Sequence, residues 1–250
     1  MEAAALVGCS VMTGVGAVTN TVKVPGRPTV AVVGCGGVGL NIIQGAKLAG
    51  ASRIIAVDLI ESKLAAATGV RRYRRRRCSQ GRRRRAGHRS MTGGGVDYAF
   101  EAIGLTKTAQ QCFEMIPPRR PAVIVGMLPL TEQLTHPHAG MAFLGEKGIV
   151  GSFYGSTRQT YDMPWLMELY RQKRLKIDEL ISRRYTLDQI NEAYDALKKG
   201  EGEPLASSSS TTETSPEPWD ERSGAPIRRG ARVSCEKAER QPFAQARTGS

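Results

Sequence analysis

The stretch TVAVVGCGGVGLNIIQGAKLAGASRIIAVD, residues Thr29–Asp58, decides the fold class. A short β-branched apolar segment runs into a glycine cluster, and a helical stretch and a second apolar run closed by Asp58 follow. Strand, helix and parallel strand in this order make a βαβ unit, and the spacing here has the expected length. The sequence therefore predicts a βαβ unit over Thr29–Asp58.

Three further apolar segments predict additional strands of the same sheet. They are VDYAFEAIG (Val96–Gly104), PAVIVGM (Pro121–Met127) and GIVGSFYG (Gly148–Gly155). A helical stretch, TKTAQQCFEMI, follows the first of them. Continuous apolar strands that alternate with amphipathic helices are typical of a parallel, doubly wound sheet. We therefore predict an α/β Rossmann fold with strand order 3-2-1-4-5-6.

The chain changes character after Gly155. MPWLMELYRQKRL and TLDQINEAYDALKKG have helical spacing, and Thr186 is placed to cap the second helix, which Gly200 is expected to end. Residues 201–250 are rich in Ser, Thr and Pro and poor in aliphatic side chains, so they predict a disordered tail.

The glycine cluster Gly34-Cys35-Gly36-Gly37-Val38-Gly39 satisfies G-x-G-x-x-G between a strand and a helix. In this context Gly34 permits the tight turn, Gly36 lets the backbone approach a pyrophosphate, and Gly39 lets the helix pack closely. Asp58 follows at the end of the second strand, where its carboxylate can accept hydrogen bonds from ribose hydroxyls and repel a 2′-phosphate. The motif predicts dinucleotide binding, with NAD favoured over NADP.

Several separate blocks carry a family resemblance. GCSVMTGVGAV, the Thr29–Asp58 stretch and GGGVDYAFEAIG resemble the zinc-dependent medium-chain alcohol dehydrogenases, a group that includes glutathione- and mycothiol-dependent formaldehyde dehydrogenases. The resemblance covers roughly Ala4–Lys63 and Thr92–Gly200. It implies hydride transfer from a primary alcohol or thiol-hemiacetal to NAD, with zinc stabilising the alkoxide.

The resemblance also implies site residues. Cys9 matches the third ligand of the catalytic zinc, although cysteine statistics alone favour a small buried hydrophobe there. Thr13 matches a residue beside the nicotinamide. The other implied cofactor-binding residues are Gly34, Gly36, Gly37, Val38 and Gly39 for the pyrophosphate, Asp58 and Lys63 for the ribose, and Ile103, Val125, Gly126 and Met127 for the nicotinamide pocket.

The zinc site of the family is incomplete in this sequence. Family members carry the other zinc-binding Cys and His in a GroES-like catalytic domain before the GC-x₃-TG segment, and here Met1 stands just before that segment. One thiolate cannot hold a catalytic zinc, which normally has three protein ligands. His88, His136 and His138 lack ligand spacing, so we expect them to face solvent. This chain alone is therefore expected to be inactive.

An arginine run departs from the family pattern. The 250-residue chain has a formal charge of +13, and Arg71–Arg89 holds eleven arginines and no acidic residue, so the remainder is near neutral. The run stands where the third strand is expected, and Val70 is the only aliphatic β-former there. We expect that strand to be lost and the sheet edge to be left unpaired. A compensated frame shift explains the run and the tail; nucleic-acid binding and a genuine extension remain alternatives.

These observations predict a remnant of the catalytic domain at residues 1–13, a Rossmann domain at 14–153 with an aberrant segment at 71–90, a returning helical piece at 154–200 and the tail at 201–250. The expected function is that of a truncated NAD-dependent zinc-type alcohol dehydrogenase acting on a small alcohol or aldehyde adduct. An inert NAD-binding module or a non-functional remnant is the alternative. Five scattered cysteines, no secretory signal and no long apolar span predict a cytoplasmic chain without membrane or specific nucleic-acid partners. The family implies a homodimer or homotetramer.

Overall fold

A computed structural model describes residues 2–67, 73–77, 94–135, 139–199, 219–220 and 225–226. The chain divides into two compact units, Met1–Ser209 and Ser210–Ser250. Within the second unit, the short strands β7 (Trp219–Asp220) and β8 (Ala225–Pro226) pair in antiparallel fashion. The predictions for residues 71–72 and 78–90 and for His136 and His138 fall outside the described residues. The predicted disordered tail also falls outside them, except at β7 and β8, which are paired strands.

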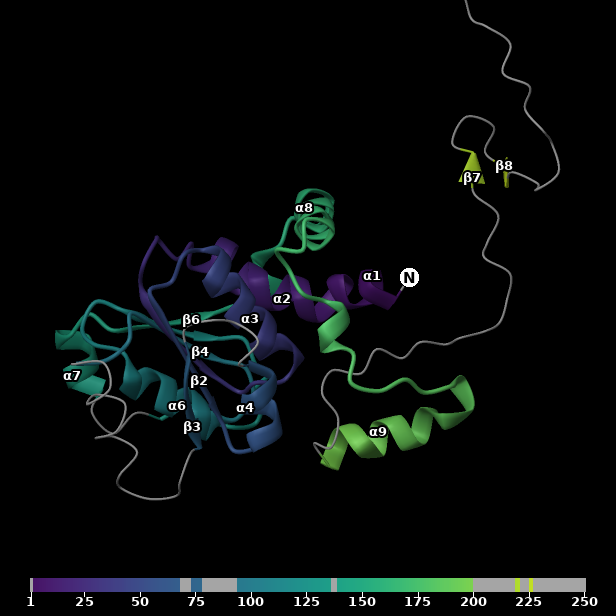
Figure 1. The fold of residues 1–250 in the computed structure, drawn as a ribbon. Helices are drawn as coiled ribbons and strands as arrows, with labels where there is room; N and C mark the ends of the chain where they lie inside the picture. Colours follow the sequence, from purple (N-terminus) through teal and green to yellow (C-terminus); the bar gives the residue numbers. More distant parts are fainter. Residues whose placement is uncertain are drawn as a thin grey trace, which may run out of the picture. The chain divides into compact units, whose positions relative to one another are not determined.

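The first unit is built on a parallel sheet of six strands in the order β3-β2-β1-β4-β5-β6 (Figure 1). The strands are β1 (Thr29–Val33), β2 (Arg53–Asp58), β3 (Tyr73–Arg77), β4 (Tyr98–Glu101), β5 (Pro121–Ile124) and β6 (Gly148–Gly151). The doubly wound α/β fold predicted from the apolar segments is confirmed, with its strand order.

The third strand corrects one sequence-based prediction. Residues Tyr73–Arg77 pair in parallel with β2, in a register that runs from Ile54↔Tyr73 to Asp58↔Arg77. The prediction that this strand is lost and that β2 forms an unpaired edge is therefore wrong. It rested on the side-chain composition, whereas strand pairing uses the N–H and C=O groups that every non-proline residue carries. Charged residues are also common on edge strands, and β3 lies at one of the two edges of the sheet.

Helices cover both faces of the sheet. The N-terminal helical segment consists of α1 (Glu2–Leu6), η1 (Val7–Val11), α2 (Met12–Gly16) and η2 (Ala17–Thr21). The others are α3 (Gly37–Leu48), α4 (Glu61–Ala67), α6 (Thr106–Met115), α7 (Ala139–Leu144), η3 (Tyr154–Ser156), α8 (Gln159–Arg171), η4 (Asp178–Leu180), η5 (Leu187–Gln189) and α9 (Ile190–Lys199).

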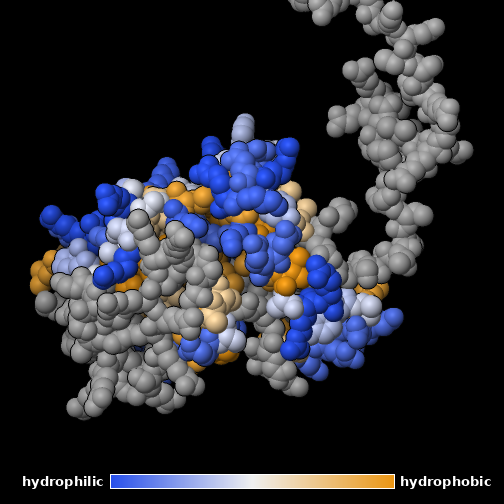
Figure 2. Space-filling model, viewed as in Figure 1, coloured by the Kyte–Doolittle hydropathy of each residue, from blue (hydrophilic) through white to orange (hydrophobic). Residues whose placement is uncertain are grey.

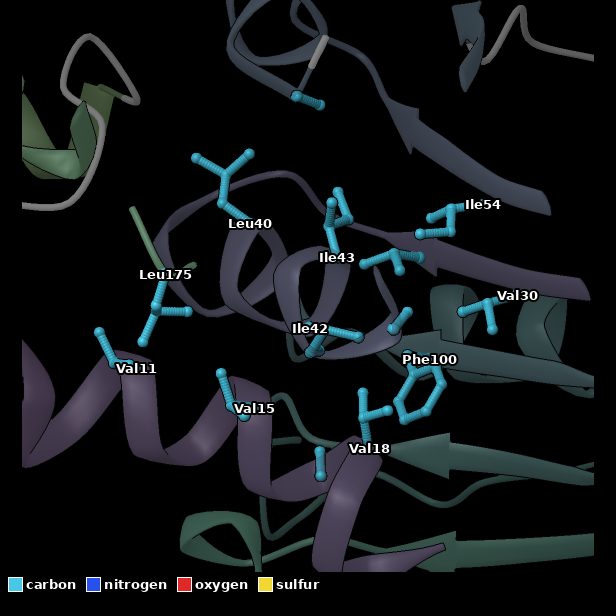
Figure 3. Close-up of a cluster of buried hydrophobic side chains, with 14 of the residues drawn as sticks. Val11, Val15, Val18, Val30, Leu40, Ile42, Ile43, Ile54, Phe100 and Leu175 are labelled. Atoms are coloured by element: carbon cyan, nitrogen blue, oxygen red, sulfur yellow. The ribbon is translucent and has the colours of Figure 1, made fainter. Parts of the chain in front are cut away.

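The core has two layers because successive strand residues point to opposite faces. On one face, the N-terminal helical segment and α3 pack on the sheet, and Figure 3 shows Val18 and Ile42 beside Phe100. On the other face, the alternate strand residues pack against α6; this layer includes Ala31, Val33, Ile55, Val57, Ala99, Cys112 and Phe113. A sheet buried on both faces explains why its strands are continuously apolar.

The N-terminal helical segment is itself a core element. Ala3–Thr21 is long and apolar enough to cross a membrane by length and composition, so the prediction that the chain has no long apolar span is wrong. Half of that segment is buried, and Val11, Val15 and Val18 have no exposed surface. Its apolarity therefore serves packing against α3.

The segment after the sheet is anchored to the same core. Leu166 and Leu169 of α8 are buried in it, while the outer surface of α8 is hydrophilic (Figure 2). The side chain of Gln44 in α3 makes two hydrogen bonds to the backbone of Lys176. Its Oε1 accepts from Lys176 N at 2.8 Å, and its Nε2 donates to Lys176 O at 2.9 Å. Thr186 caps η5 with Gln189 in a capping box, as its position in the sequence predicts.

Candidate functional site

The glycine turn joins β1 to α3 in a conformation that excludes larger residues at two positions. Gly34 has φ of +96°, and a Cβ there would lie 2.6 Å from Ile103 Cγ1. A Cβ on Gly39 would lie 1.8 Å from the carbonyl oxygen of Gly34, so the first turn of α3 rests directly on the end of the strand. Gly36, in contrast, has no atom within 4 Å of the Cβ position. The turn is closed on the protein side and open at Gly36.

The first turn of α3 fits an anionic group. The helix has 12 residues, begins at Gly37, and has no side-chain cap and no acidic residue in its first turn. The backbone N–H groups of such a terminus lack intrahelical partners, and the helix dipole is positive there. Val38 lies in this turn and is half-buried. A cradle of this kind suits a pyrophosphate.

Asp58 is fixed at the end of β2 beside the turn. Its Oδ2 accepts a hydrogen bond from Cys35 N at 2.7 Å, and its Oδ1 accepts one from Ile60 N at 2.9 Å. Each carboxylate oxygen can accept a second hydrogen bond, so the group remains able to bind a hydroxyl. The carboxylate therefore holds the glycine turn as well as offering an acceptor, a role that spacing alone did not predict. Lys63, in the adjacent helix α4, is half-buried.

The loops after β4 and β5 lie at the same edge of the sheet. Ile103 is half-exposed and approaches Gly34, while Met127 is exposed. Val125 N and Gly126 N donate to the carbonyl oxygen of Glu101 at 2.9 and 3.0 Å, which joins the two loops. The carboxyl ends of parallel strands are where open α/β sheets bind ligands. The structure thus brings the predicted pyrophosphate, ribose and nicotinamide residues to one edge.

Glu101 was missed as a site residue. It is the last residue of β4 and has no exposed surface. A buried carboxylate is costly unless hydrogen bonds satisfy it, so a lone acidic residue inside the apolar run VDYAFEAIG was the signal available in the sequence.

Cys9 and Thr13 lie four residues apart on the N-terminal helical segment, which puts them on one face. Cys9 is exposed, so the alternative interpretation of this residue as a buried hydrophobe is wrong. Thr13 is half-buried, and its carbonyl oxygen lies 3.0 Å from the Cβ position of Gly155. Among the described residues, no group of three or more His, Cys, Asp or Glu side chains could hold a metal ion. The part of the chain that the structure describes therefore does not by itself fit a catalytic zinc.

The three cysteines of the described ranges predict a sharp contrast in reactivity. Cys9 is exposed, whereas Cys35 and Cys112 are buried. Burial, and then the neighbouring charge of Glu101, raises the pKa of the Cys112 thiol well above its ordinary value. Because the thiolate is the reactive form, we expect iodoacetamide at neutral pH to modify Cys9 and spare Cys112 in the folded protein. Peptide mass spectrometry measures both sites, with a urea-unfolded sample as the control; equal labelling of the two in the native chain would contradict the described burial.

The comparisons with known proteins agree with this geometry. The family model described as zinc-binding dehydrogenase matches residues 37–172. The chain is 36% identical to alcohol dehydrogenase class-3 of Caenorhabditis elegans, over 80% of this chain and 53% of that protein. It is 35% identical to alcohol dehydrogenase 1 of Zea mays, over 81% of this chain and 53% of that protein. It thus spans about half the length of the curated relatives it matches.

Solved structures give the same result. Benzyl alcohol dehydrogenase from Acinetobacter calcoaceticus superposes with a TM-score of 0.73 at 31% identity, covering 80% of this chain and 55% of that one. A zinc-binding dehydrogenase from Sinorhizobium meliloti bound to NADP superposes with a TM-score of 0.66 at 26% identity, covering 74% and 53%. With the glycine turn, the strand order and the family model in agreement, the chain belongs to the zinc-dependent medium-chain alcohol dehydrogenases.

Proposed function

We propose that this chain is the cofactor-binding part of an NAD-dependent zinc-type alcohol dehydrogenase, which transfers a hydride from a primary alcohol or thiol-hemiacetal to NAD. The observation that carries the NAD assignment is the contact between Asp58 Oδ2 and Cys35 N at 2.7 Å. It fixes a carboxylate beside a glycine turn that is open to a ligand at Gly36. A phosphate cradle with a hydroxyl acceptor beside it is the arrangement by which Rossmann folds bind dinucleotides.

Different residues bind different parts of the cofactor. The N–H groups from Gly34 to Gly39 bind the pyrophosphate, and Asp58 with Lys63 binds the adenosine ribose. Thr13, Ile103 and the segment Val125–Met127 surround the nicotinamide, which accepts the hydride when NAD is bound. The negative charge of Asp58 opposes a 2′-phosphate, so NAD is preferred, although the Sinorhizobium meliloti neighbour was solved with NADP.

For zinc, Cys9 is the residue this chain offers. The remaining ligands of a catalytic zinc are not among the described residues. The same observation favours the second candidate function, a catalytically inert NAD-binding module or a remnant without function. The compensated frame shift remains our proposal for residues 71–90 and 201–250, and specific nucleic-acid binding is not part of the proposed function.

Absorbance assays for NADH production separate the two candidates. The purified chain is incubated with NAD, zinc and a series of primary alcohols or glutathione–formaldehyde adducts. We expect no turnover by the chain alone, and a denatured sample gives the background rate. Turnover that depends on added zinc would contradict the incomplete metal site and would support the complete dehydrogenase function for this chain.

The proposed domains follow the family pattern, with catalytic-domain pieces at residues 1–13 and 154–200 flanking a Rossmann domain at 14–153. The unit Met1–Ser209 contains all three pieces. A cytoplasmic location is supported by Cys9 and Cys112, which form no disulfide among the described residues, since disulfides are rare in that compartment.

We further propose that the chain forms a homodimer through β6, with a homotetramer as the alternative. Within the described sheet, β6 pairs only with β5, so its other side presents unpaired backbone groups. Ile149 on this strand is 45% exposed, and the residues beside it in sequence, Phe143, Leu144 and Phe153, are 82%, 75% and 88% exposed. An apolar edge of this kind can pair with its own copy about a two-fold axis.

A charge on this edge is expected to prevent the dimer. Ile149→Lys puts an ammonium group on an exposed side of β6, so the fold is retained while the apolar contact is lost. Size-exclusion chromatography with light scattering measures the mass, and Tyr161→Lys on exposed α8 serves as the matched control. We expect a dimer for the wild type and for the control, and a monomer for Ile149→Lys. A dimer that survives this substitution would exclude the β6 edge.

A further inference from the structure

Glu101 organises the loop that follows β4. Its Oε1 accepts hydrogen bonds from Ile103 N at 3.0 Å, Gly104 N at 2.9 Å and Thr108 Oγ1 at 2.7 Å. These donors span the whole connection from the strand to the first turn of α6. The carboxylate has no exposed surface, and hydrogen bonds from charged groups are stronger inside a protein than in water. The backbone of Ile103 is thereby held by a buried charge.

The main chain of the same residue holds the neighbouring loop. The carbonyl oxygen of Glu101 accepts from both Val125 N and Gly126 N, at 2.9 and 3.0 Å. One residue thus connects the loop after β4 with the loop after β5. These loops carry the residues proposed to surround the nicotinamide, Ile103 and Val125–Met127.

The two loops approach so closely that only glycine fits between them. A Cβ on Gly126 would lie 2.2 Å from Gly104 N and 2.5 Å from Glu101 Oε2. Gly104 has φ of +92°, and a Cβ there would lie 2.5 Å from the carbonyl oxygen of Met127. A small displacement of the Glu101 carboxylate therefore moves both loops together.

The second carboxylate oxygen has a different environment. Glu101 Oε2 is buried and makes no hydrogen bond within the described part of the chain. A buried acceptor without a partner carries a desolvation cost and is rare in native proteins. A cap for three donors requires only the Oε1 side of this group. The extra oxygen faces Gly126, so the carboxylate fills the space between the two loops as well as capping one of them.

We propose that Glu101 is a positioning residue for the nicotinamide end of the cofactor: it fixes the loops after β4 and β5 in the relative arrangement that receives this ring. The inference rests on the proposed NAD site. Glu101 acts through Ile103 and Gly126 and has no exposed surface with which to touch the cofactor. The adenosine side is formed by Asp58 and the glycine turn, at the ends of β1 and β2. The hydrogen bonds given for the Glu101 carboxylate go instead to Ile103, Gly104 and Thr108.

The test distinguishes binding of the nicotinamide end of the cofactor from binding of the adenosine end. Calorimetric titrations with NAD and with ADP-ribose, which lacks the nicotinamide, are compared for wild type and Glu101→Leu. Loss of a charged acceptor shared by three donors is expected to weaken NAD binding by roughly tenfold or more and to leave ADP-ribose binding within about twofold. Glu101→Gln keeps an acceptor oxygen for the three donors, so it is expected to restore NAD binding to within about threefold of wild type.

Thr108→Val provides a second variant if leucine prevents folding. It removes only the hydroxyl donor at 2.7 Å, and it is expected to weaken NAD binding by about threefold with ADP-ribose binding unchanged. Proportional losses for both ligands, or no loss for either, would overturn the positioning role. Wild-type protein that binds neither ligand would instead overturn the proposed function, and with it the basis of this inference.

Discussion

Replacing Gly39 with alanine is expected to destabilise the chain severely. The new Cβ would lie 1.8 Å from the carbonyl oxygen of Gly34 and 2.8 Å from its carbonyl carbon. Both atoms belong to a turn held between β1 and β2 by the hydrogen bond from Gly34 N to Val57 O at 2.8 Å, so neither can move without breaking the sheet. We expect a loss of more than about 4 kcal/mol in the free energy of unfolding, measured by urea denaturation.

Gly36→Ala is the matched control for this effect. No atom lies within 4 Å of its Cβ position, and its φ of −77° suits any residue. Its free energy of unfolding should therefore stay within about 0.5 kcal/mol of wild type. NAD binding, in contrast, should be lost, because the methyl group would occupy the open side where the pyrophosphate approaches. A stable Gly39→Ala protein would contradict the described turn, and a Gly36→Ala protein that binds NAD normally would exclude this approach.

Asp58→Ala is expected to produce a large loss of NAD affinity. The substitution removes the proposed ribose acceptor, and it also leaves Cys35 N and Ile60 N without their partner. Hydrogen bonds to a charged group contribute about 1.5–3 kcal/mol, so the dissociation constant for NAD should rise by roughly tenfold to a hundredfold. Calorimetric titration measures this change. Unchanged NAD affinity would contradict the assignment of Asp58 to the ribose.

Asp58→Asn tests the effect of the negative charge while an oxygen acceptor remains. The amide oxygen can still accept from Cys35 N, while the negative charge that opposes a 2′-phosphate is gone. We therefore expect NADP affinity to rise relative to NAD affinity in this variant. An unchanged preference between the two cofactors would show that the charge of Asp58 does not determine it.

The fold could be predicted because its main elements have strong local patterns. The β-branched runs at Thr29–Val33 and Arg53–Asp58, with the glycine cluster between them, leave few alternatives to a parallel βαβ unit. β3 could not be predicted in this way, since Tyr73–Arg77 has no apolar pattern. Its pairing depends on chain spacing and on the backbone groups that β2 exposes, and neither appears in a hydrophobicity pattern.

The sequence predicted those site residues whose type is also required by the backbone conformation. The glycines of the turn are visible in the sequence because the conformation of Gly34 and the contact at Gly39 exclude other residues. The role of Glu101 and the hydrogen bond from Cys35 N to Asp58 depend on segments that meet through long-range packing. A single sequence gives the residue type at such positions, and the partners become known only when the strands are assembled.

The most direct test of the central claim is a calorimetric titration of the purified chain with NAD and with NADP. We expect saturable binding of NAD at one site per chain and weaker binding of NADP, by about tenfold or more, because Asp58 opposes the 2′-phosphate. Circular dichroism beforehand establishes that the chain is folded. A folded chain that binds no NAD, or that binds NADP more tightly, would contradict the proposed NAD site.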